Sequence, residues 1–219
     1  MYPALADLFP AGVVVAGGPP ALASGELFLA ETQLIAGAVA ARRRDFAAGR
    51  LFARAALARL GVAPQPILAR ERRPLWPPGM LGAITHAEGR CAAAVARRGE
   101  IVGIGLDVER ADAVTPELHR HVLTAGERDR LAALPADDQT RMATLIFSAK
   151  EAFYKSLAEL NLGFVGFDEV CIAHAADGSF TVDGRTAALR RALASVAVRG
   201  RTVVEDRWLW TAMTLTRLA

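Results

Sequence analysis

The stretch "IVGIGLDVER", residues 101–110, stands near the middle of the 219-residue chain and separates two segments of similar pattern. Its first six residues are apolar or glycine and carry no charge, which is typical of a buried strand. On each side of it, a long helical pattern is followed by short strand patterns. We therefore expect an α+β fold of two similar halves, joined near residues 99–111, although no sequence repeat connects them.

The order of expected elements is the same in both halves. The first half has an expected strand at 12–17, a helical region at 29–60 and strands at 82–86 and 91–98. The length of that helical region suggests two helices that meet near Arg44–Asp45. The second half has expected helices at 115–123, 125–134 and about 138–159, and strands at 167–174, 178–183 and 207–216.

Composition bounds the class of protein. Hydrophobic residues make up 53% of the chain and aromatic residues only 6%, so we expect a core of small aliphatic side chains. Cys91 and Cys171 lie in apolar runs and are predicted to be buried free thiols. The first residues lack the pattern of a secretory signal, and no apolar run reaches the ~18–20 residues that span a membrane. These features predict a cytoplasmic protein, which we expect to be a monomer.

Charge is distributed unevenly. Up to Arg110 there are 13 basic and 9 acidic residues, whereas the remainder holds 13 basic and 14 acidic residues. The excess of positive charge in the first half favours a small anionic ligand or a nucleic acid there.

Two carboxylates follow the apolar run of the opening strand. Asp107 and Glu109 are two residues apart, so they project from the same face of the strand. Neighbouring carboxylates repel unless a cation lies between them, and Mg²⁺ prefers oxygen ligands. The alternative is a strand end in solvent, where Arg110 neutralises one of the two acids.

The second distinctive stretch is "FSAKEAFYKS", residues 147–156. It contains both lysines of the chain, Lys150 and Lys155, whereas the other 24 basic residues are arginine. Glu151 and Lys155 share one helix face and could be an ordinary surface pair. A lysine can also donate a proton, as an arginine cannot, and a glutamate beside it suits a general base.

Basic side chains cluster twice in the first half. "RRRDFAAGR" (42–50) contains Arg42, Arg43, Arg44 and Arg50, and "ARERRP" (69–74) contains Arg70, Arg72 and Arg73. Arginine forks are favoured for gripping phosphate, although a solvated helix face would look the same. Thr85 and His86 end an apolar strand in "GAITHAEG" (82–89), where either a binding site or a structural role is open.

Together these segments resemble the 4′-phosphopantetheinyl transferases, in the larger single-chain branch that serves siderophore, nonribosomal-peptide and polyketide synthases. "GIGLDVE" (103–109) is similar to the family's (I/V)G(I/V)D-x-E strand motif, with Leu106 before the aspartate. "FSAKEAFYK" (147–155) matches the (F/W)-(S/C/T)-x-K-E-(A/S)-x-x-K motif at every defined position. "RPLWPPGMLGAITH" (73–86) is similar to a third motif, but Ala87 stands where many members have serine. The resemblance covers roughly residues 40–165.

The resemblance implies a fold and a reaction. The fold would have two α+β halves, 1–103 and 104–219, related by a pseudo-twofold axis with the ligand site between them. The reaction would move the phosphopantetheine group of coenzyme A to a serine of an apo acyl, peptidyl or aryl carrier protein. Mg²⁺, or alternatively Mn²⁺, would be required.

The resemblance also implies roles for individual residues. Asp107, Glu109 and Glu151 would hold the metal, with Asp107 also close to the coenzyme A pyrophosphate. Glu151 would be the base that deprotonates the carrier serine, and Lys155 would neutralise or protonate the departing phosphate. The remaining coenzyme A contacts would come from Arg42, Arg50, Arg70, Arg73, Thr85, His86 and Lys150.

The carrier protein would need a second surface, for which we expect the helical segment Thr115–Leu134. Its Leu118, Val122 and Leu123 could be core residues instead. Two other functions stay open: another Mg²⁺-dependent phosphoryl-transfer enzyme or phosphohydrolase, and a basic nucleic-acid-binding protein. Trp208 and Trp210 lie in an apolar strand, which argues against base stacking and hence against nucleic acid.

Overall fold

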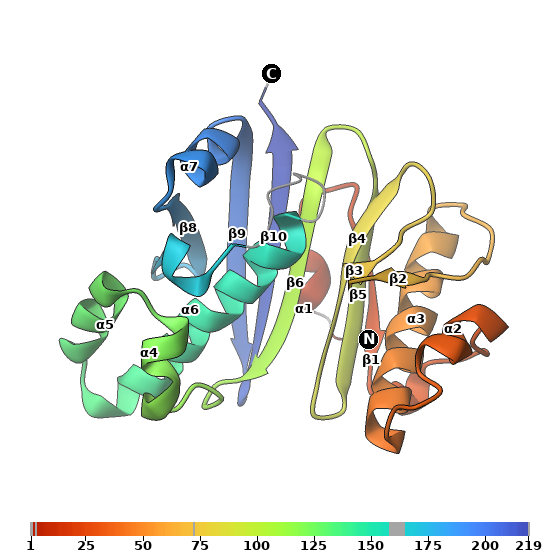
Figure 1. The fold of residues 1–219 in the computed structure, drawn as a ribbon, viewed down its shortest axis with the longest axis horizontal. Helices are drawn as coiled ribbons and strands as arrows, with labels where there is room; N and C mark the ends of the chain where they lie inside the picture. Colours follow the sequence, from red (N-terminus) through yellow and green to blue (C-terminus); the bar gives the residue numbers. More distant parts are fainter. Residues whose placement is uncertain (1, 3, 72, 158–164, 219) are drawn as a thin grey trace.

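A computed structural model describes residues 2, 4–71, 73–157 and 165–218, and it has the predicted α+β fold (Figure 1). Two antiparallel sheets lie next to each other, and one long helix covers each sheet. The helix of the first half is α3 (Ala40–Arg59), and that of the second is α6 (Ala136–Ser156). The ligand site was expected where these two halves meet.

The strands form three sheets among the described residues. Their bounds are β1 Val14–Gly18, β2 Ala69–Arg70, β3 Arg73–Pro74, β4 Met80–Ala87, β5 Arg90–Arg97, β6 Ile101–Arg110, β7 Val170–His174, β8 Ser179–Gly184, β9 Val196–Glu205 and β10 Trp208–Arg217. The shorter helices are α1 Ala4–Asp7, α2 Leu29–Leu34, α4 His119–Val122, α5 Ala125–Ala132 and α7 Ala187–Leu193. Short 3-10 turns occur at Pro20–Leu22, Pro116–Leu118 and Phe167–Glu169.

The two main sheets share one topology. The first has the order β1-β5-β4, and the second begins β6-β10-β9 before adding β8 and β7. In each, the strand before the long helix pairs with the second strand of a later hairpin, β4–β5 in one half and β9–β10 in the other. The duplication that the sequence pattern suggested is therefore present in the connectivity.

Glycines in β6 set the distance between this strand and α6. A Cβ atom at Gly105 would overlap the carbonyl oxygen of Ala152, and one at Gly103 would overlap that of Ser156. Because only glycine leaves this space, the helix lies directly on the strand. The "GIG" of the strand motif thus brings the α6 backbone close to Asp107.

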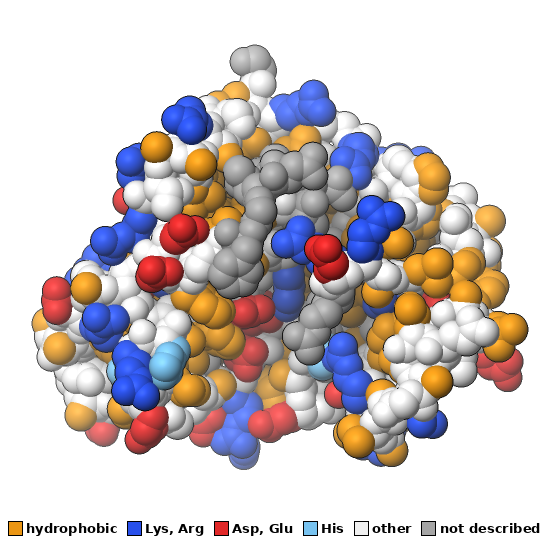
Figure 2. Space-filling view, in the orientation of Figure 1, with side chains coloured by type: hydrophobic (Ala, Val, Ile, Leu, Met, Phe, Trp, Pro, Cys, Tyr) orange, Lys and Arg blue, Asp and Glu red, His pale blue; other side chains and the backbone are white. Residues whose placement is uncertain are grey.

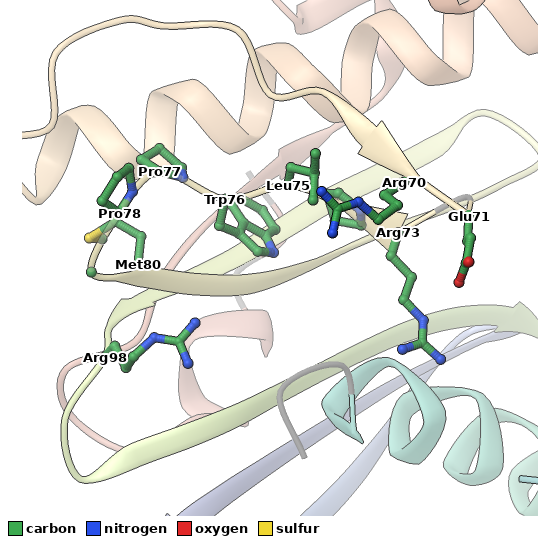
Figure 3. Close-up of a pocket in the computed structure, with 11 residues that line it drawn as sticks. Arg70, Glu71, Arg73, Leu75, Trp76, Pro77, Pro78, Met80 and Arg98 are labelled. Carbon is green, nitrogen blue, oxygen red and sulfur yellow. The ribbon is translucent and has the colours of Figure 1, made fainter. Parts of the chain in front are cut away.

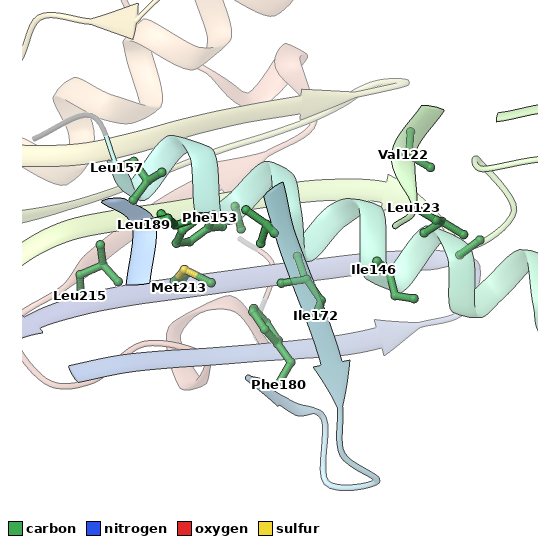
Figure 4. Close-up of a cluster of buried hydrophobic side chains, with 14 of the residues drawn as sticks. Val122, Leu123, Ile146, Phe153, Leu157, Ile172, Phe180, Leu189, Met213 and Leu215 are labelled. Atoms are coloured by element: carbon green, nitrogen blue, oxygen red, sulfur yellow. The ribbon is translucent and has the colours of Figure 1, made fainter. Parts of the chain in front are cut away.

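The core of the second half fills the space beneath α6. Phe153 is fully buried on the helix, and Figure 4 shows it among side chains from β10, such as Met213 and Leu215. Ile172 and Phe180 close this core from β7 and β8. This packing gives α6 a fixed support on the sheet.

In each half, a buried glutamate is paired with a basic residue of the long helix. Glu31, at the start of α2, accepts hydrogen bonds from the Arg54 guanidinium at 2.7 Å, and Glu127, at the start of α5, accepts one from the Lys150 ammonium at 2.7 Å. The two partners are 23 residues apart in both pairs. Glu31 also accepts the backbone N–H of Ile67. We call these the Glu31–Arg54 pair and the Glu127–Lys150 pair.

Several predicted elements need correction. The region 29–60 does contain two helices, but they are separated at residues 35–39 rather than near Arg44–Asp45. The helix predicted at 138–159 is α6, which ends at Ser156, and residues 158–159 lie outside the described residues. The expected helix 115–123 is a 3-10 turn followed by the single turn α4.

The sequence patterns missed α7 and β9 altogether. The predicted boundary between the halves 1–103 and 104–219 falls inside β6, which pairs with β10 of the second half. The division into two domains remains a prediction, and we place its joint in the turn before Ile101.

Both cysteines have free thiols, as predicted. Cys91 is buried, but Cys171 is only half-buried, and its sulfur accepts a hydrogen bond from Arg130 at 3.2 Å. No helix in the described part of the chain is long and apolar enough to cross a membrane.

Candidate active site

Asp107 lies where the two halves meet. Its side chain is buried, and its Oδ1 atom accepts a hydrogen bond from the Lys155 ammonium at 2.7 Å. The same ammonium donates to the backbone carbonyl of Leu106 at 3.1 Å. Thr85, on β4 of the first half, lies 3.4 Å from both Asp107 Oδ1 and Lys155 Nζ. The structure thus brings together three of the predicted site residues, Thr85, Asp107 and Lys155, from three elements.

A hydroxyl network holds the other oxygen of Asp107. Ser148 on α6 donates to Oδ2 at 2.8 Å, and its hydroxyl lies 2.9 Å from that of Thr211. Thr202 continues the chain at 3.1 Å. Asp107, Thr211 and Thr202 are direct neighbours across β6, β10 and β9. Sequence reasoning missed these hydroxyls, although threonines recurring in the apolar run of β10 were a usable signal.

One row of side chains on helix α6 faces Asp107. Ser148, Glu151 and Lys155 are spaced by three and four residues and share the face that meets Asp107. Burial raises the pKa of Glu151, with Asp107 adding to the rise and Lys155 opposing it. A carboxylate with a raised pKa is better suited to accept a proton near neutrality.

Glu109 is the third predicted metal ligand. Its pKa is raised to about 8, mainly by burial and also by the charge of Asp107, while Lys155 opposes the rise and Glu151 adds to it. The three carboxylates therefore act on each other electrostatically, which a divalent cation would relieve.

The chemistry of this donor set fits Mg²⁺, which takes carboxylate oxygens together with water and phosphate. Among the residues that the structure describes, no group of three His, Cys, Asp or Glu side chains is already gathered around one point as a metal site would be. Asp107 is instead paired with Lys155. The ligand set Asp107, Glu109 and Glu151 therefore remains a prediction.

A pocket of about 360 Å³ lies on the first half between α3 and β4. His86 and Arg42 face each other there, and Arg42 Nη1 donates to His86 Nε2 at 2.7 Å. Burial lowers the pKa of His86, Asp45 opposes this, and Arg42 and Lys155 lower it further. The histidine is therefore neutral near pH 7 and can accept this hydrogen bond.

Arg50 supplies a buried positive charge to the same pocket. Its Nε atom donates to the carbonyl of Ile67 at 2.7 Å, and its guanidinium lies 4.3 Å from the centre of the Phe46 ring. Burial lowers its pKa to about 10, so it is still charged at neutral pH. A buried cation next to apolar walls suits an anionic group attached to a flat or apolar one.

Arg70 and Arg73 line a different pocket, of about 370 Å³ (Figure 3). Figure 3 shows Arg73 extended toward α6, while Trp76 and Arg98 form the opposite part of the wall. Pro74 lines both pockets, so they are neighbours. The structure thus separates these arginines from Arg42, Arg50 and His86, and their role toward a ligand remains a prediction.

The prediction for Lys150 needs a correction. It was expected near the ligand, but its side chain is fully buried. Its ammonium donates to Val122 O at 3.0 Å, to Glu127 Oε2 at 2.7 Å and to Phe167 O at 2.7 Å. All three N–H groups are used by the protein, so none is left for a ligand.

The segment expected to receive the carrier protein divides into core and surface. Val122 and Leu123 are buried in the core of the second half, whereas Leu118 is 43% exposed. Figure 2 shows acidic and basic side chains beside one another in the middle of the face viewed in Figure 1.

Comparison with known proteins identifies both halves. Residues 30–96 match the family model described as the 4′-phosphopantetheinyl transferase N-terminal domain, and residues 103–209 match that of the 4′-phosphopantetheinyl transferase superfamily. The 4′-phosphopantetheinyl transferase PptT of Mycobacterium tuberculosis is 35% identical over 196 residues, which cover 84% of this chain and 84% of that protein.

The 4′-phosphopantetheinyl transferase Svp of Streptomyces mobaraensis is 39% identical over 158 residues. That match covers 71% of this chain, which spans only 64% of the length of Svp. A solved holo-(acyl-carrier-protein) synthase from Bacillus anthracis, in complex with CoA (3′,5′-ADP), aligns with a TM-score of 0.45 and 20% identity. It covers 55% of this chain and all of that one.

Proposed function

The chain belongs to the 4′-phosphopantetheinyl transferase superfamily, and we propose that it transfers the phosphopantetheine group of coenzyme A to a serine of an apo carrier protein. One observation carries the proposal. His86 lines the pocket that also contains Arg42 and Arg50, and the charges of Lys155 and Asp107 act on it, so the carboxylate and ammonium groups lie near a pocket with the cations that phosphate favours. The released product would be adenosine 3′,5′-bisphosphate.

The pocket of the first half would hold the adenosine end of coenzyme A. Arg50 is a buried cation that an anion would stabilise, and Arg42 and His86 stand at the side nearest Lys155. Guanidinium forks bind phosphate through charge-assisted hydrogen bonds. The 3′-phosphate would lie against Arg42 and Arg50, and the pyrophosphate would extend past His86 toward Asp107.

The residues of α6 would carry the transfer itself. Glu151 has the raised pKa of a base and would take the proton from the carrier serine, whose oxygen then bonds to the phosphorus bearing pantetheine. The bond from that phosphorus to the oxygen of adenosine bisphosphate breaks. Lys155 would neutralise the charge on the departing phosphate.

Asp107, Glu109 and Glu151 would hold Mg²⁺, or Mn²⁺ in its place. The bound ion would supply charge neutralisation and alignment of the phosphates. The Ser148–Thr211–Thr202 network keeps the Asp107 carboxylate in one orientation, which a metal ligand requires.

We further propose that the carrier serves siderophore, nonribosomal-peptide or polyketide synthesis in the cytoplasm, and that it docks near the exposed Leu118. A nucleic-acid role gains no support, because Trp208 and Trp210 are buried and cannot stack on bases.

Intact-mass spectrometry tests the reaction. Incubation with Mg²⁺, coenzyme A and a panel of apo carriers should add about 340 Da, the mass of the transferred group, to at least one of them. A carrier with its acceptor serine replaced by alanine, and a sample with EDTA, are the controls and should gain nothing. Release of adenosine bisphosphate without any modified carrier would favour a phosphohydrolase instead and contradict the proposal.

A further inference from the structure

The Glu127–Lys150 pair connects four elements of the second half. Lys150, on α6, bonds Val122 at the end of α4 and Phe167 in the 3-10 turn that precedes β7. Glu127, which is also fully buried, accepts the backbone N–H of Thr124 through Oε2 and that of Ile172 on β7 through Oε1, both at 2.7 Å. All three donors of Lys150 and both carboxylate oxygens of Glu127 are therefore engaged within the protein.

Two other side chains on the same row of α6 contact the same turn. The Tyr154 hydroxyl donates to Gly166 O at 2.9 Å, and its ring meets Phe167 edge-on with centroids 5.1 Å apart. Phe147 lies 5.8 Å from the Phe167 ring, centroid to centroid. Phe147, Lys150 and Tyr154 are spaced by three and four residues, so they form one continuous row along the helix.

This row is adjacent to the row that meets Asp107. Glu151 directly follows Lys150, and Lys155 directly follows Tyr154. Successive residues are about 100° apart around a helix axis. A rotation of α6 that moved Glu151 away from Asp107 would therefore pull Lys150 from its three partners.

We propose that Lys150 is a positioning residue for the transfer step, acting through the rotation of α6. It holds the helix at the angle that directs Glu151 and Lys155 toward Asp107, and it does not touch the substrate. This inference rests on the proposed function. It also assigns the lysine of the "KE" motif to the scaffold and the adjacent glutamate to the chemistry.

The first half offers a matched control. The Glu31–Arg54 pair has the same separation along the chain and ties α3 to α2, and through Ile67 to the segment that follows α3. Its helix carries Arg42 and Arg50 rather than the reacting groups. Loosening α3 should therefore affect coenzyme A binding, and loosening α6 should affect turnover.

The experiment compares Lys150→Met with Arg54→Met, and the neutral doubles Glu127→Gln/Lys150→Met and Glu31→Gln/Arg54→Met. Calorimetric titration with coenzyme A counts the binding-competent sites, so that kcat is expressed per competent site. For the Lys150 variants we expect kcat to fall about 100-fold, as for a misplaced catalytic group, with KM for coenzyme A changed less than tenfold. For the Arg54 variants we expect KM to rise about tenfold with kcat nearly unchanged.

A Lys150 variant that binds coenzyme A at full stoichiometry and keeps kcat within about threefold of the wild type would overturn the inference. If Lys150→Met does not fold, the neutral double decides. If that also fails to fold, Glu127→Gln decides, because glutamine keeps the size and shape of the side chain and removes the charge that pairs with Lys150; an unchanged kcat there overturns the inference as well.

The two proposals fail in different ways. A wild-type protein that modifies no carrier contradicts the proposed function. Hydrogen exchange still tests the positioning role in that case: the Glu127→Gln variant should exchange faster both in Phe167–Glu169 and along α6 near Glu151. Faster exchange in the turn alone, with α6 unchanged, would show that the pair does not hold the helix.

Discussion

Helices α3 and α6 are held in the same way but present different chemistry to the junction between them. Each is anchored through a buried glutamate at the start of a shorter helix, and each lies on the sheet of its own half. From α3 come Arg42 and Arg50, which carry fixed positive charge. From α6 come Glu151 and Lys155, whose charges can change during a reaction.

The anchors themselves also differ. The Glu127–Lys150 pair is completely buried on both sides, whereas the Arg54 side chain is 11% exposed. Arg54 also reaches the carbonyl of Glu26 and stacks over Phe28. The fully buried pair anchors α6, which would carry out the reaction. The partly exposed pair anchors α3, which would bind coenzyme A. We therefore expect the orientation of α6 to be more tightly fixed than that of α3.

The largest expected effect comes from Asp107→Asn. Loss of its charge removes a proposed metal ligand and the partner of Lys155, so we expect kcat to fall about 10³-fold or more. Binding of coenzyme A, measured by calorimetry without metal, should change little because Arg42 and Arg50 are untouched. Full activity of this variant at any Mg²⁺ concentration would refute the separation of binding and chemistry between the two halves.

Stability should distinguish the two anchors next. Lys150→Met leaves the Glu127 charge buried and unpaired, and we expect it to lower the free energy of unfolding by about 3 kcal/mol in urea titrations. Arg54→Met should cost about half as much, because solvent reaches that pair. Equal losses would mean that the difference in burial has no energetic consequence.

Arg42→Ala tests the binding role of the first half. It removes one guanidinium from the pocket at an exposed position, so folding should be unaffected. We expect KM for coenzyme A to rise about tenfold, with kcat within about twofold of the wild type. Arg44→Ala, on the same helix but outside the lining of that pocket, is the control. A loss confined to kcat would place Arg42 with the reacting groups.

The smallest effect concerns pH and His174, a half-buried histidine of the second half. Burial lowers the pKa of His174, although its hydrogen bond with Leu145 O opposes this shift. Below about pH 6.5, the ordinary value for histidine, the unfolded chain therefore binds more protons than the folded one. The free energy of unfolding should therefore fall as pH drops below about 6.5. Above that pH, the contribution of neutral His174 to stability should be complete.

Urea titrations between pH 7.5 and 5.5 measure this slope, and His174→Gln should flatten it. Burial lowers the pKa of His86 too, but that histidine faces Arg42 in the proposed binding pocket. We therefore expect coenzyme A to change the contribution of His86 to the pH dependence of unfolding and to leave that of His174 unchanged.

Patterns of the sequence identified the parts of the site that depend on neighbours along the chain. Asp107 and Glu109 share a strand face, and Glu151 and Lys155 share a helix face, because backbone geometry fixes both spacings. The family resemblance then predicted that these two faces meet at one site. The arrangement in two similar α+β halves followed from the repeated helix-and-strand pattern, whereas the order of the strands within each sheet did not.

Contacts between distant segments were not predictable in this way. Nothing local distinguishes Lys150 from Lys155, since only the position of Glu127 and Phe167 decides which one is buried. The arginines of β9 point outward and interrupt its apolar pattern, so that strand was missed. Arg70 and Arg73 are paired across the short strands β2 and β3, whose direction depends on tertiary packing, and they line a neighbouring pocket.

The contact between Lys155 and Asp107 has a thermodynamic consequence. An ammonium occupies the carboxylate that a cation would need, so the two cations compete for it. An arriving phosphate that draws Lys155 toward itself ends that competition and strengthens the affinity for the cation. By linkage, the cation must strengthen the affinity for the phosphate by the same factor. If Asp107 holds the proposed cation, this one short ion pair would make the cation and the phosphate bind cooperatively without any movement of the backbone.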